Sequence, residues 1–316
     1  MKLMGIVGKI ATCVIASLFI SGCDGVKKQE QKPLKVLMIG NSFSICLLSH
    51  LPQVAHAYQK PLDLCSMYIG GCSLERHCQN IAKSDDASFK PYKVDWDYEL
   101  VRNEESTLVC KATEFDGKSY RANIPEILKA EKWDVVTIQQ ASHFSWKKET
   151  FEPWGEILIK TIKEYAPSAE IIVQETWSYT PWDKRLKDWG IDQNQMYCAL
   201  NKTYAEFARK NGLRIIPVGT AVQIYRKALP VKYTENSLGG DPCGKCEFVK
   251  NDKGEFITKG DVFHFNREGE YLQALTWAGV LFGVDPVKCS YQPDGMDATR
   301  ASVMRSSAKN AIDEIR

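Results

Sequence analysis

The sequence predicts a three-layer α/β/α sandwich with a five-stranded parallel sheet at its centre. Short apolar runs alternate with amphipathic stretches, which is typical of βα units on a parallel sheet. Glycine and polar residues follow several of the apolar runs, where open α/β sheets carry their functional loops. Hydrophobic residues make up 44% of the 316 residues, which is enough for a substantial buried core.

Five apolar runs are predicted to be the strands, because each is short and rich in aliphatic and β-branched residues. They lie at residues 35–39, 62–69, 133–139, 169–175 and 213–218. Amphipathic stretches predict the helices. These lie at residues 45–59, from about 73, and at 151–165, 192–211, 266–282 and 298–315. Pro167 and Gly212 follow two of these helices and are typical residues to end them.

Two segments depart from the alternation of strands and helices. Residues 89–120 contain two runs typical of strands and predict a small antiparallel insertion. Residues 235–260 are rich in Gly, Lys and Asp and predict a surface excursion. No convincing domain boundary follows residue 33, so we expect residues 34–316 to form one domain.

The N-terminus has the pattern of a targeting segment. Lys2 and Lys9 form a basic region, and residues 10–20 are apolar but too few to span a bilayer. The sequence from Ile20 to Cys23 resembles the bacterial lipobox. This resemblance implies cleavage before Cys23 and attachment of lipid to its thiol.

We therefore expect a signal peptide at residues 1–22, and a lipidated Cys23 with a flexible tether over residues 23–33. Two or more acyl chains would hold the protein stably on a membrane, which places it at the cell envelope. The alternative is an ordinary signal peptide whose cleavage site happens to contain a cysteine.

Charge argues against nucleic acid as a partner. The formal net charge is +2, and acidic and basic residues are interspersed, so no basic patch is predicted. The sequence has no run of 18 or more apolar residues, so no membrane-spanning helix is expected.

Cysteine usage does not indicate a disulfide framework. Of eleven cysteines, nine remain once Cys13 and Cys23 are assigned to the signal peptide and the anchor, and an odd number cannot all pair within the chain. Cys243 and Cys246 favour a surface disulfide or two free thiols over half of a zinc site, because no second ligand pair of suitable spacing lies nearby.

Polar loops follow the predicted strands at the edge where open α/β sheets bind ligands. The first strand is followed by Gly40-Asn41-Ser42, and a loop near the C-terminus carries Asp261 and His264. A serine hydroxyl becomes nucleophilic when a histidine takes its proton and an acidic residue orients that histidine. Ser42, His264 and Asp261 are therefore candidates for nucleophile, base and orienting acid.

Three short motifs, in this order along the chain, resemble those of the SGNH, or GDSL-type, hydrolases. They are a Gly-Asn-Ser that ends at Ser42, a Gly-Cys-Ser that begins at Gly71, and an Asp-x-x-His that ends at His264. The resemblance implies an SGNH hydrolase-like domain in which Ser42 is the nucleophile, His264 the base and Asp261 its orienting acid. It also implies that the backbone N–H groups of Ser42 and Gly71 bind the oxyanion.

One motif departs from the family pattern. The family usually has Gly-x-Asn-Asp after the third strand, where the Asn side chain donates to the oxyanion. This chain has Gln139-Gln140-Ala141-Ser142. This motif resembles that of an uncharacterised branch of bacterial lipoproteins in the superfamily. Gln139 or Gln140 could replace the Asn donor, and the sequence leaves open which of them does so.

Further candidates for substrate contact lie in loops at the same edge. His143 follows the third predicted strand, and Trp177 follows the fourth. Trp177 begins an aromatic cluster with Tyr179, Trp182 and Trp189. These rings could stack on sugar faces, and packing within the loop is the alternative.

Structural alternatives exist for the triad as well. Ser42 could serve only as a helix N-cap, Ser44 could be the nucleophile instead, and Asp261 with His264 could form a structural pair. The joint pattern favours catalysis over each of these.

The predicted function is a serine hydrolase that cleaves ester bonds, most specifically a cell-surface carbohydrate O-acyl (acetyl) esterase. Such a reaction needs no metal and no organic cofactor. Its partners would be a small-molecule or glycan ester and the membrane. The alternatives are a lipase or thioesterase that uses the same triad, and a glycan-binding lipoprotein without catalysis.

Overall fold

The computed structural model describes residues 31–96, 98–102, 108–112, 120–229, 233–234 and 237–315. Residues from Lys32 onward form one compact unit. The predicted signal peptide, Cys23 and most of the tether lie outside the described residues, so these remain predictions.

The central sheet has seven strands in the order β6-β3-β2-β1-β7-β8-β9. Five of them pair in parallel, as the sequence predicts. These are β1 (Leu34–Gly40), β2 (Leu62–Tyr68), β7 (Val135–Ile138), β8 (Glu170–Gln174) and β9 (Arg214–Ile216). The predicted total of five strands is wrong, because the insertion adds two strands to the edge at β2.

The predicted antiparallel insertion is confirmed. Its strand β3 (Tyr92–Trp96) pairs antiparallel with β2, and β6 (Tyr120–Ala122) pairs antiparallel with β3. Two further strands, β4 (Tyr98–Arg102) and β5 (Leu108–Ala112), form a separate antiparallel pair. Pairing with β3 satisfies the backbone groups that β2 would otherwise expose as an edge strand.

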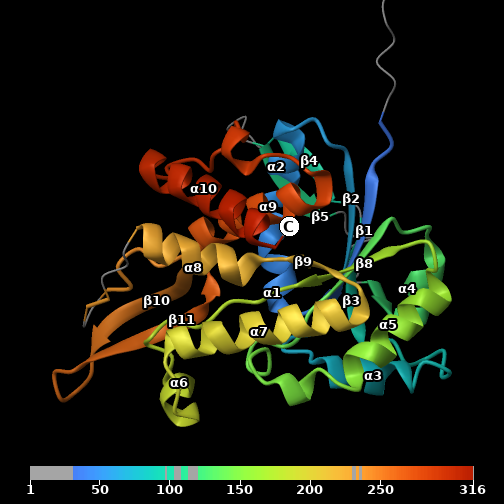
Figure 1. The fold of residues 1–316 in the computed structure, drawn as a ribbon, viewed down its shortest axis with the longest axis horizontal. Coiled ribbons are helices and arrows are strands. Elements are labelled where there is room, and N and C mark those ends of the chain that lie inside the picture. The colour runs from blue at the N-terminus through green and yellow to red at the C-terminus, as the bar shows by residue number, and fades with distance from the viewer. Residues whose placement is uncertain are drawn as a thin grey trace, which may run out of the picture. The chain divides into compact units, whose positions relative to one another are not determined.

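Helices form two layers around the sheet (Figure 1). One layer holds α3 (Leu74–Ile81), α4 (Ile124–Ala130), α5 (Trp154–Tyr165) and α7 (Gln193–Asn211). The other holds α1 (Ser42–Ile45), η1 (Cys46–Ser49), α2 (Leu51–Ala57), α8 (Val218–Ala228), α9 (Arg267–Phe282) and α10 (Ala298–Glu314). The short elements η3 (Lys148–Thr150), α6 (Lys184–Trp189) and η4 (Pro286–Lys288) lie in connecting segments. The three-layer α/β/α architecture is therefore confirmed.

Local sequence signals explain several helix ends. Gly212 adopts a left-handed conformation at the end of α7, which favours glycine. Asn266 caps α9 by accepting hydrogen bonds from the next turn. The helix predicted at 45–59 is divided into α1, η1 and α2. Pro52 lies in the first turn of α2, where proline is favoured, and so marks the start of a new helix.

The predicted surface excursion forms a two-stranded antiparallel ribbon. Its strands are β10 (Cys243–Lys250) and β11 (Phe256–Phe265). Asp261 and His264 lie within β11, not in a loop as the sequence predicts. The ribbon therefore delivers both side chains from one strand, directly before the start of α9.

Three tryptophans, Trp133, Trp177 and Trp277, are among the largest fully buried side chains. Within the described residues, no helix has the length and apolar character required to cross a membrane.

Candidate active site

Ser42 lies at the turn between β1 and α1. Asn41 caps the helix, and its Oδ1 accepts a hydrogen bond of 3.0 Å from the Phe43 amide. Gly40 precedes it in a crowded position, where a Cβ would lie 2.5 Å from the Ser44 hydroxyl oxygen. The close packing of this turn explains the glycine and fixes where the Ser42 side chain begins.

The structure brings Ser42, His264 and Asp261 together in one hydrogen-bonded chain. The His264 Nε2 atom lies 2.6 Å from the Ser42 Oγ atom, although the residues are 222 positions apart. On the other side of the ring, His264 Nδ1 is hydrogen-bonded to Asp261 Oδ2. The side chains of His264 and Asp261 are 23% and 29% exposed, respectively, so substrate and water can reach the site.

Asp261 is held as a carboxylate. Its Oδ1 accepts hydrogen bonds from the backbone N–H groups of Phe263 (2.8 Å) and His264 (2.9 Å). Burial acts to raise the pKa of Asp261, but the hydrogen bonds from the His264 ring and these two amides outweigh burial and lower the pKa to about 2. A charged Asp261 favours a proton on Nδ1 of His264, which leaves Nε2 free to accept the Ser42 proton.

Trp177 supports the strand that carries His264. Its indole N–H donates to the Phe263 carbonyl over 2.8 Å, and its ring stacks on Phe43 and on Phe265 at centroid distances of 4.0 and 3.5 Å. Trp177 is 0% exposed. The predicted substrate contact of Trp177 is therefore wrong, because the ring has no surface to offer a ligand.

Gly71 lies in the loop that follows β2, with a left-handed φ of 59°. It is exposed, and no heavy atom lies within 4 Å of where a Cβ would stand. The loop is tied to the Ser42 turn, because the Asn41 side-chain amide donates to the Cys72 carbonyl over 3.0 Å. This connection holds the Gly71 backbone close to the start of α1.

Gln139 and Gln140 both use their side-chain amides inside the fold. Gln139 donates to Asn41 Oδ1 over 2.8 Å, and Gln140 donates to the Thr150 carbonyl over 2.8 Å. Both residues are buried. An oxyanion role for either glutamine stays a prediction.

A buried amide network continues from Gln139. Gln174 donates to Gln139 Oε1 and to the Phe43 carbonyl, and Gln273 donates to the same carbonyl over 2.8 Å. Trp277 donates to Gln174 Oε1 over 2.6 Å. The network joins β7, β8 and α9 beneath the Ser42 turn, and buried polar groups linked in this way favour one fixed arrangement.

The rival nucleophile Ser44 is poorly placed. Its side chain is 2% exposed, and its hydroxyl donates to the Asn41 carbonyl over 2.8 Å. Only Ser42 of the two lies against His264.

Residues 35–236 match the family described as a domain of unknown function, DUF4886. This match spans more than half of the 316 residues. The chain belongs to the DUF4886 family. Its Ser42 and Gly71 lie within the matched range, and Asp261 and His264 lie beyond it.

A solved DUF4886 family protein from Bacteroides uniformis is similar to this chain at 27% identity with a TM-score of 0.68. The similarity covers 89% of this chain and 95% of that protein. Comparison with the curated proteins finds no match.

Two further solved structures are similar at lower identity. One is a candidate SGNH hydrolase from Slackia heliotrinireducens (17% identity, TM-score 0.48, covering 78% of this chain and 98% of that one). The other is an acetyl xylan esterase (9% identity, TM-score 0.46, covering 78% and 100%).

His143 of this DUF4886 chain lies in the loop after β7 and is half-buried. Burial lowers its pKa, and the positive charges of Arg185 and Lys147 lower it further. The structure thus places two cations near a residue that the sequence predicts to contact substrate. Neither Arg185 nor Lys147 stands in a motif, so sequence reasoning missed both.

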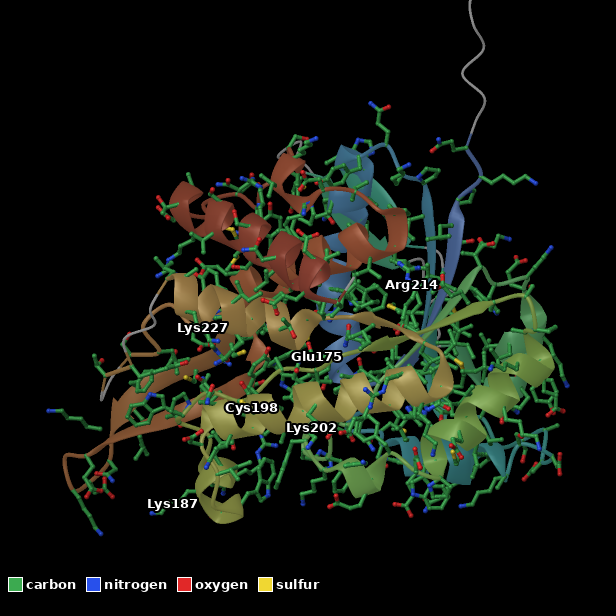
Figure 2. All side chains as sticks on the ribbon, in the orientation of Figure 1. Glu175, Lys187, Cys198, Lys202, Arg214 and Lys227 are labelled. Atoms are coloured by element: carbon green, nitrogen blue, oxygen red, sulfur yellow. The ribbon has the colours of Figure 1, made fainter. Side chains whose placement is uncertain are left out.

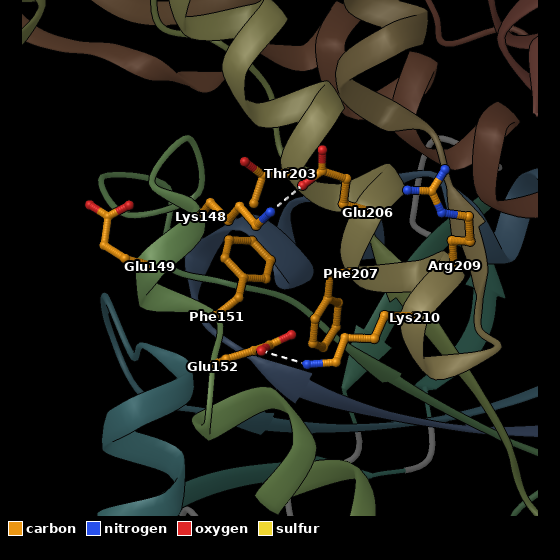
Figure 3. Close-up of a pocket in the computed structure, with 9 residues that line it drawn as sticks. All are labelled: Lys148, Glu149, Phe151, Glu152, Thr203, Glu206, Phe207, Arg209 and Lys210. Atoms are coloured by element: carbon orange, nitrogen blue, oxygen red, sulfur yellow. Dashed lines mark ion pairs between the residues drawn. The ribbon is translucent and has the colours of Figure 1, made fainter.

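A separate hollow of the DUF4886 domain, of about 530 Å³, lies between η3 and α7 (Figure 3). Lys148 pairs with Glu206 at 2.7 Å, and Lys210 pairs with Glu152 at 2.6 Å within it. Its lining contains no residue of the Ser42 site. Within the described part of the chain, no group of three or more His, Cys, Asp or Glu residues is placed to hold a metal ion.

Proposed function

We propose that this protein is a serine hydrolase that cleaves ester bonds. The observation that carries the proposal is the continuous chain of hydrogen bonds from Ser42 through His264 to Asp261. A hydroxyl in contact with an imidazole, which is itself oriented by a carboxylate, is the arrangement that activates serine for acyl transfer.

In the proposed reaction, the Ser42 Oγ attacks the ester carbonyl while His264 Nε2 takes the hydroxyl proton. The negative charge on the carbonyl oxygen is held by the backbone N–H groups of Ser42 and Gly71. Ser42 is the first residue of α1, where an amide has no partner within the helix. Gln139 or Gln140 would supply a third donor only if its side-chain amide gave up a hydrogen bond that it makes within the fold and donated to the oxyanion instead.

The second half of the reaction reverses these roles. His264 gives its proton to the alcohol that leaves, and the acyl group remains on Ser42. A water molecule then gives a proton to His264 and attacks the acyl carbonyl. The bond between the acyl group and Ser42 breaks, the acid is released, and His264 returns the proton to the Ser42 Oγ. Neither step requires a metal or an organic cofactor.

The aromatic surroundings favour a carbohydrate ester as substrate. Ring contacts connect His264 to Phe263, then to Tyr179 and Trp189, at centroid distances of 4.2, 5.2 and 5.8 Å. Trp189 contacts Trp146 at 5.4 Å. Tyr179 is fully buried, whereas Phe263, Trp189 and Trp146 are partly exposed. Partly exposed rings suit the CH faces of sugars, so we propose an O-acyl, and specifically O-acetyl, group on a sugar as the substrate.

The proposed place of action is the cell envelope. It rests on the pattern of residues 1–22 and on Cys23. A Cys23→Ser variant should leave the membrane fraction when cells are fractionated. Continued membrane association of this variant would contradict the lipid anchor.

Labelling with a fluorophosphonate tests the hydrolase proposal, because this probe reacts with activated serines. Digestion and mass spectrometry should find the label on Ser42, and a Ser42→Ala variant should take up none. A Ser49→Ala variant is the control, because Ser49 is exposed in the same segment. A wild-type protein that takes up no label contradicts the proposal.

A further inference from the structure

Arg185 lies beside the catalytic histidine with one aromatic ring between them. The carbon of its guanidinium group is 4.1 Å from the centroid of the Phe263 ring, and that ring is 4.2 Å from the His264 ring. Tyr179 supports the guanidinium from a second side at 4.2 Å. The positive charge of Arg185 is therefore fixed at the edge of the active site.

Arg185 is oriented by Asp183 and keeps further N–H groups that can donate hydrogen bonds. Its Nε and Nη2 atoms donate to the two carboxylate oxygens of Asp183 over 2.8 and 2.6 Å. A guanidinium group has five N–H bonds. The two on Nη1 and the second on Nη2 have no acceptor among the described residues, and the side chain is 30% exposed. The outer edge of the group can therefore bind a ligand.

Lys147 adds a second cation on the same side of the site. Its Nζ atom lies 5.0 Å from the centroid of Trp146 and 6.0 Å from that of Trp189. No described carboxylate forms an ion pair with Lys147. Trp189 in turn contacts Tyr179, the ring that supports Arg185. Both cations also act to lower the pKa of His143.

We propose that the ester substrate is an O-acylated acidic sugar, and that Arg185 binds its carboxylate with Lys147 alongside. This inference rests on the proposed function and names the substrate class of that same site. The free edge of a guanidinium matches the two oxygens of a carboxylate. Asp183 pairs with Arg185, and the Asp261 carboxylate is close enough to act on Arg185 as well. The site therefore carries little excess positive charge, which suits a singly charged carboxylate better than a phosphate monoester with up to two negative charges.

The test compares two acetylated sugars that differ only at one carbon: acetylated methyl galactopyranoside and its uronate counterpart. The wild-type protein should hydrolyse the uronate ester with a kcat/KM about tenfold higher or more, and added salt should reduce this preference. Arg185→Gln should bring the ratio of the two kcat/KM values close to one. Equal kcat/KM values for the two esters in the wild-type protein would overturn the inference.

Lys187→Gln is the matched control, because Lys187 is exposed on the same helix, α6 (Figure 2), and its substitution changes the charge equally. This variant should keep the wild-type ratio. If Lys187→Gln reduces the ratio of the two kcat/KM values as much as Arg185→Gln does, the effect is one of general charge, and the role of Arg185 is overturned.

A measurement on the wild-type protein alone covers the case in which Arg185→Gln does not fold. Free galacturonate should inhibit hydrolysis of 4-nitrophenyl acetate more strongly than free galactose, and equal inhibition overturns the inference. If neither ester is hydrolysed and Ser42 takes up no fluorophosphonate, the proposed function itself falls, and this inference with it.

Discussion

The side-chain amide of Gln139 donates to Oδ1 of Asn41 over 2.8 Å. Asn41 makes two further hydrogen bonds. Its side-chain amide donates to the Cys72 carbonyl, and its Oδ1 also accepts from the Phe43 amide. One asparagine thus joins the loops that follow β1, β2 and β7. These loops carry Ser42, Gly71 and the two glutamines of the predicted oxyanion site.

Asn41→Asp should destabilise the protein by about 1–3 kcal/mol, because a carboxylate cannot donate to the Cys72 carbonyl and becomes a buried charge. Thermal unfolding measures the change. Asn123→Asp is the control, because Asn123 caps α4 and aspartate caps helices equally well. A variant Asn41→Asp as stable as the wild-type protein would show that Asn41 does not hold the loops together.

Asp261→Asn should keep the fold and lower kcat by about 10³–10⁴-fold, because the amide no longer enforces the proton on Nδ1 of His264. Steady-state kinetics with 4-nitrophenyl acetate measures the loss. Asp252→Asn is the control, because Asp252 is exposed in the turn of the same ribbon. A loss smaller than about tenfold would assign Asp261 a structural role.

Trp177→Phe should lower kcat and leave KM nearly unchanged. Phenylalanine keeps part of the stacking on Phe43 and Phe265 but loses the hydrogen bond to the Phe263 carbonyl, so His264 is held less firmly. Trp189→Ala should instead raise KM for acetylated sugars, because Trp189 is partly exposed in the aromatic series. The reverse pattern in the two variants would return Trp177 to a role in substrate binding.

Glu175 should make the protein less stable as pH rises. Burial raises its pKa to about 7, against hydrogen bonds from Thr220 and Asn201 that act to lower it. The folded state therefore holds this proton more tightly than the unfolded state. The stabilisation is complete below the unfolded pKa of about 4.5 and is lost as pH rises through 7.

The expected loss from this one group, between about pH 4.5 and pH 8, is about 3 kcal/mol. Measurement of the unfolding free energy across this range, in the wild-type protein and in Glu175→Gln, isolates it. The difference between the two proteins should change with pH, whereas Glu149→Gln, at an exposed position, should follow the wild-type curve. A constant difference for Glu175→Gln would mean that folding does not raise the pKa of Glu175.

The parallel strands and the proximity of Ser42, His264 and Asp261 could be predicted because their signals are local. Apolar runs mark the strands, and Ser42 and the Asp261–His264 pair stand in short motifs. The segment after the third predicted strand shows the limit of this approach. Gln139 and Gln140 occur where the family places an oxyanion donor, but their hydrogen-bond partners are decided by the fold, and Asn41 is 98 residues away from Gln139.

The burial of Trp177 and the position of Arg185 could not be predicted either, because both depend on residues that are distant in the sequence. Trp177 reads as a surface aromatic, and only the packing of Phe43 and Phe265 on its two sides shows that it is buried. Arg185 is one of many surface cations in the sequence. Its position becomes meaningful only when β11 places Phe263 against it.

The most direct test of the central claim is the kcat/KM of Ser42→Ala for 4-nitrophenyl acetate, measured beside the wild-type protein with melting temperatures for both. The hydroxyl of Ser42 makes its contact with His264 at a partly exposed turn, so its removal should leave the melting temperature close to that of the wild-type protein. We predict a loss of kcat/KM of at least about 10³-fold. A folded Ser42→Ala variant with wild-type kcat/KM would contradict the account.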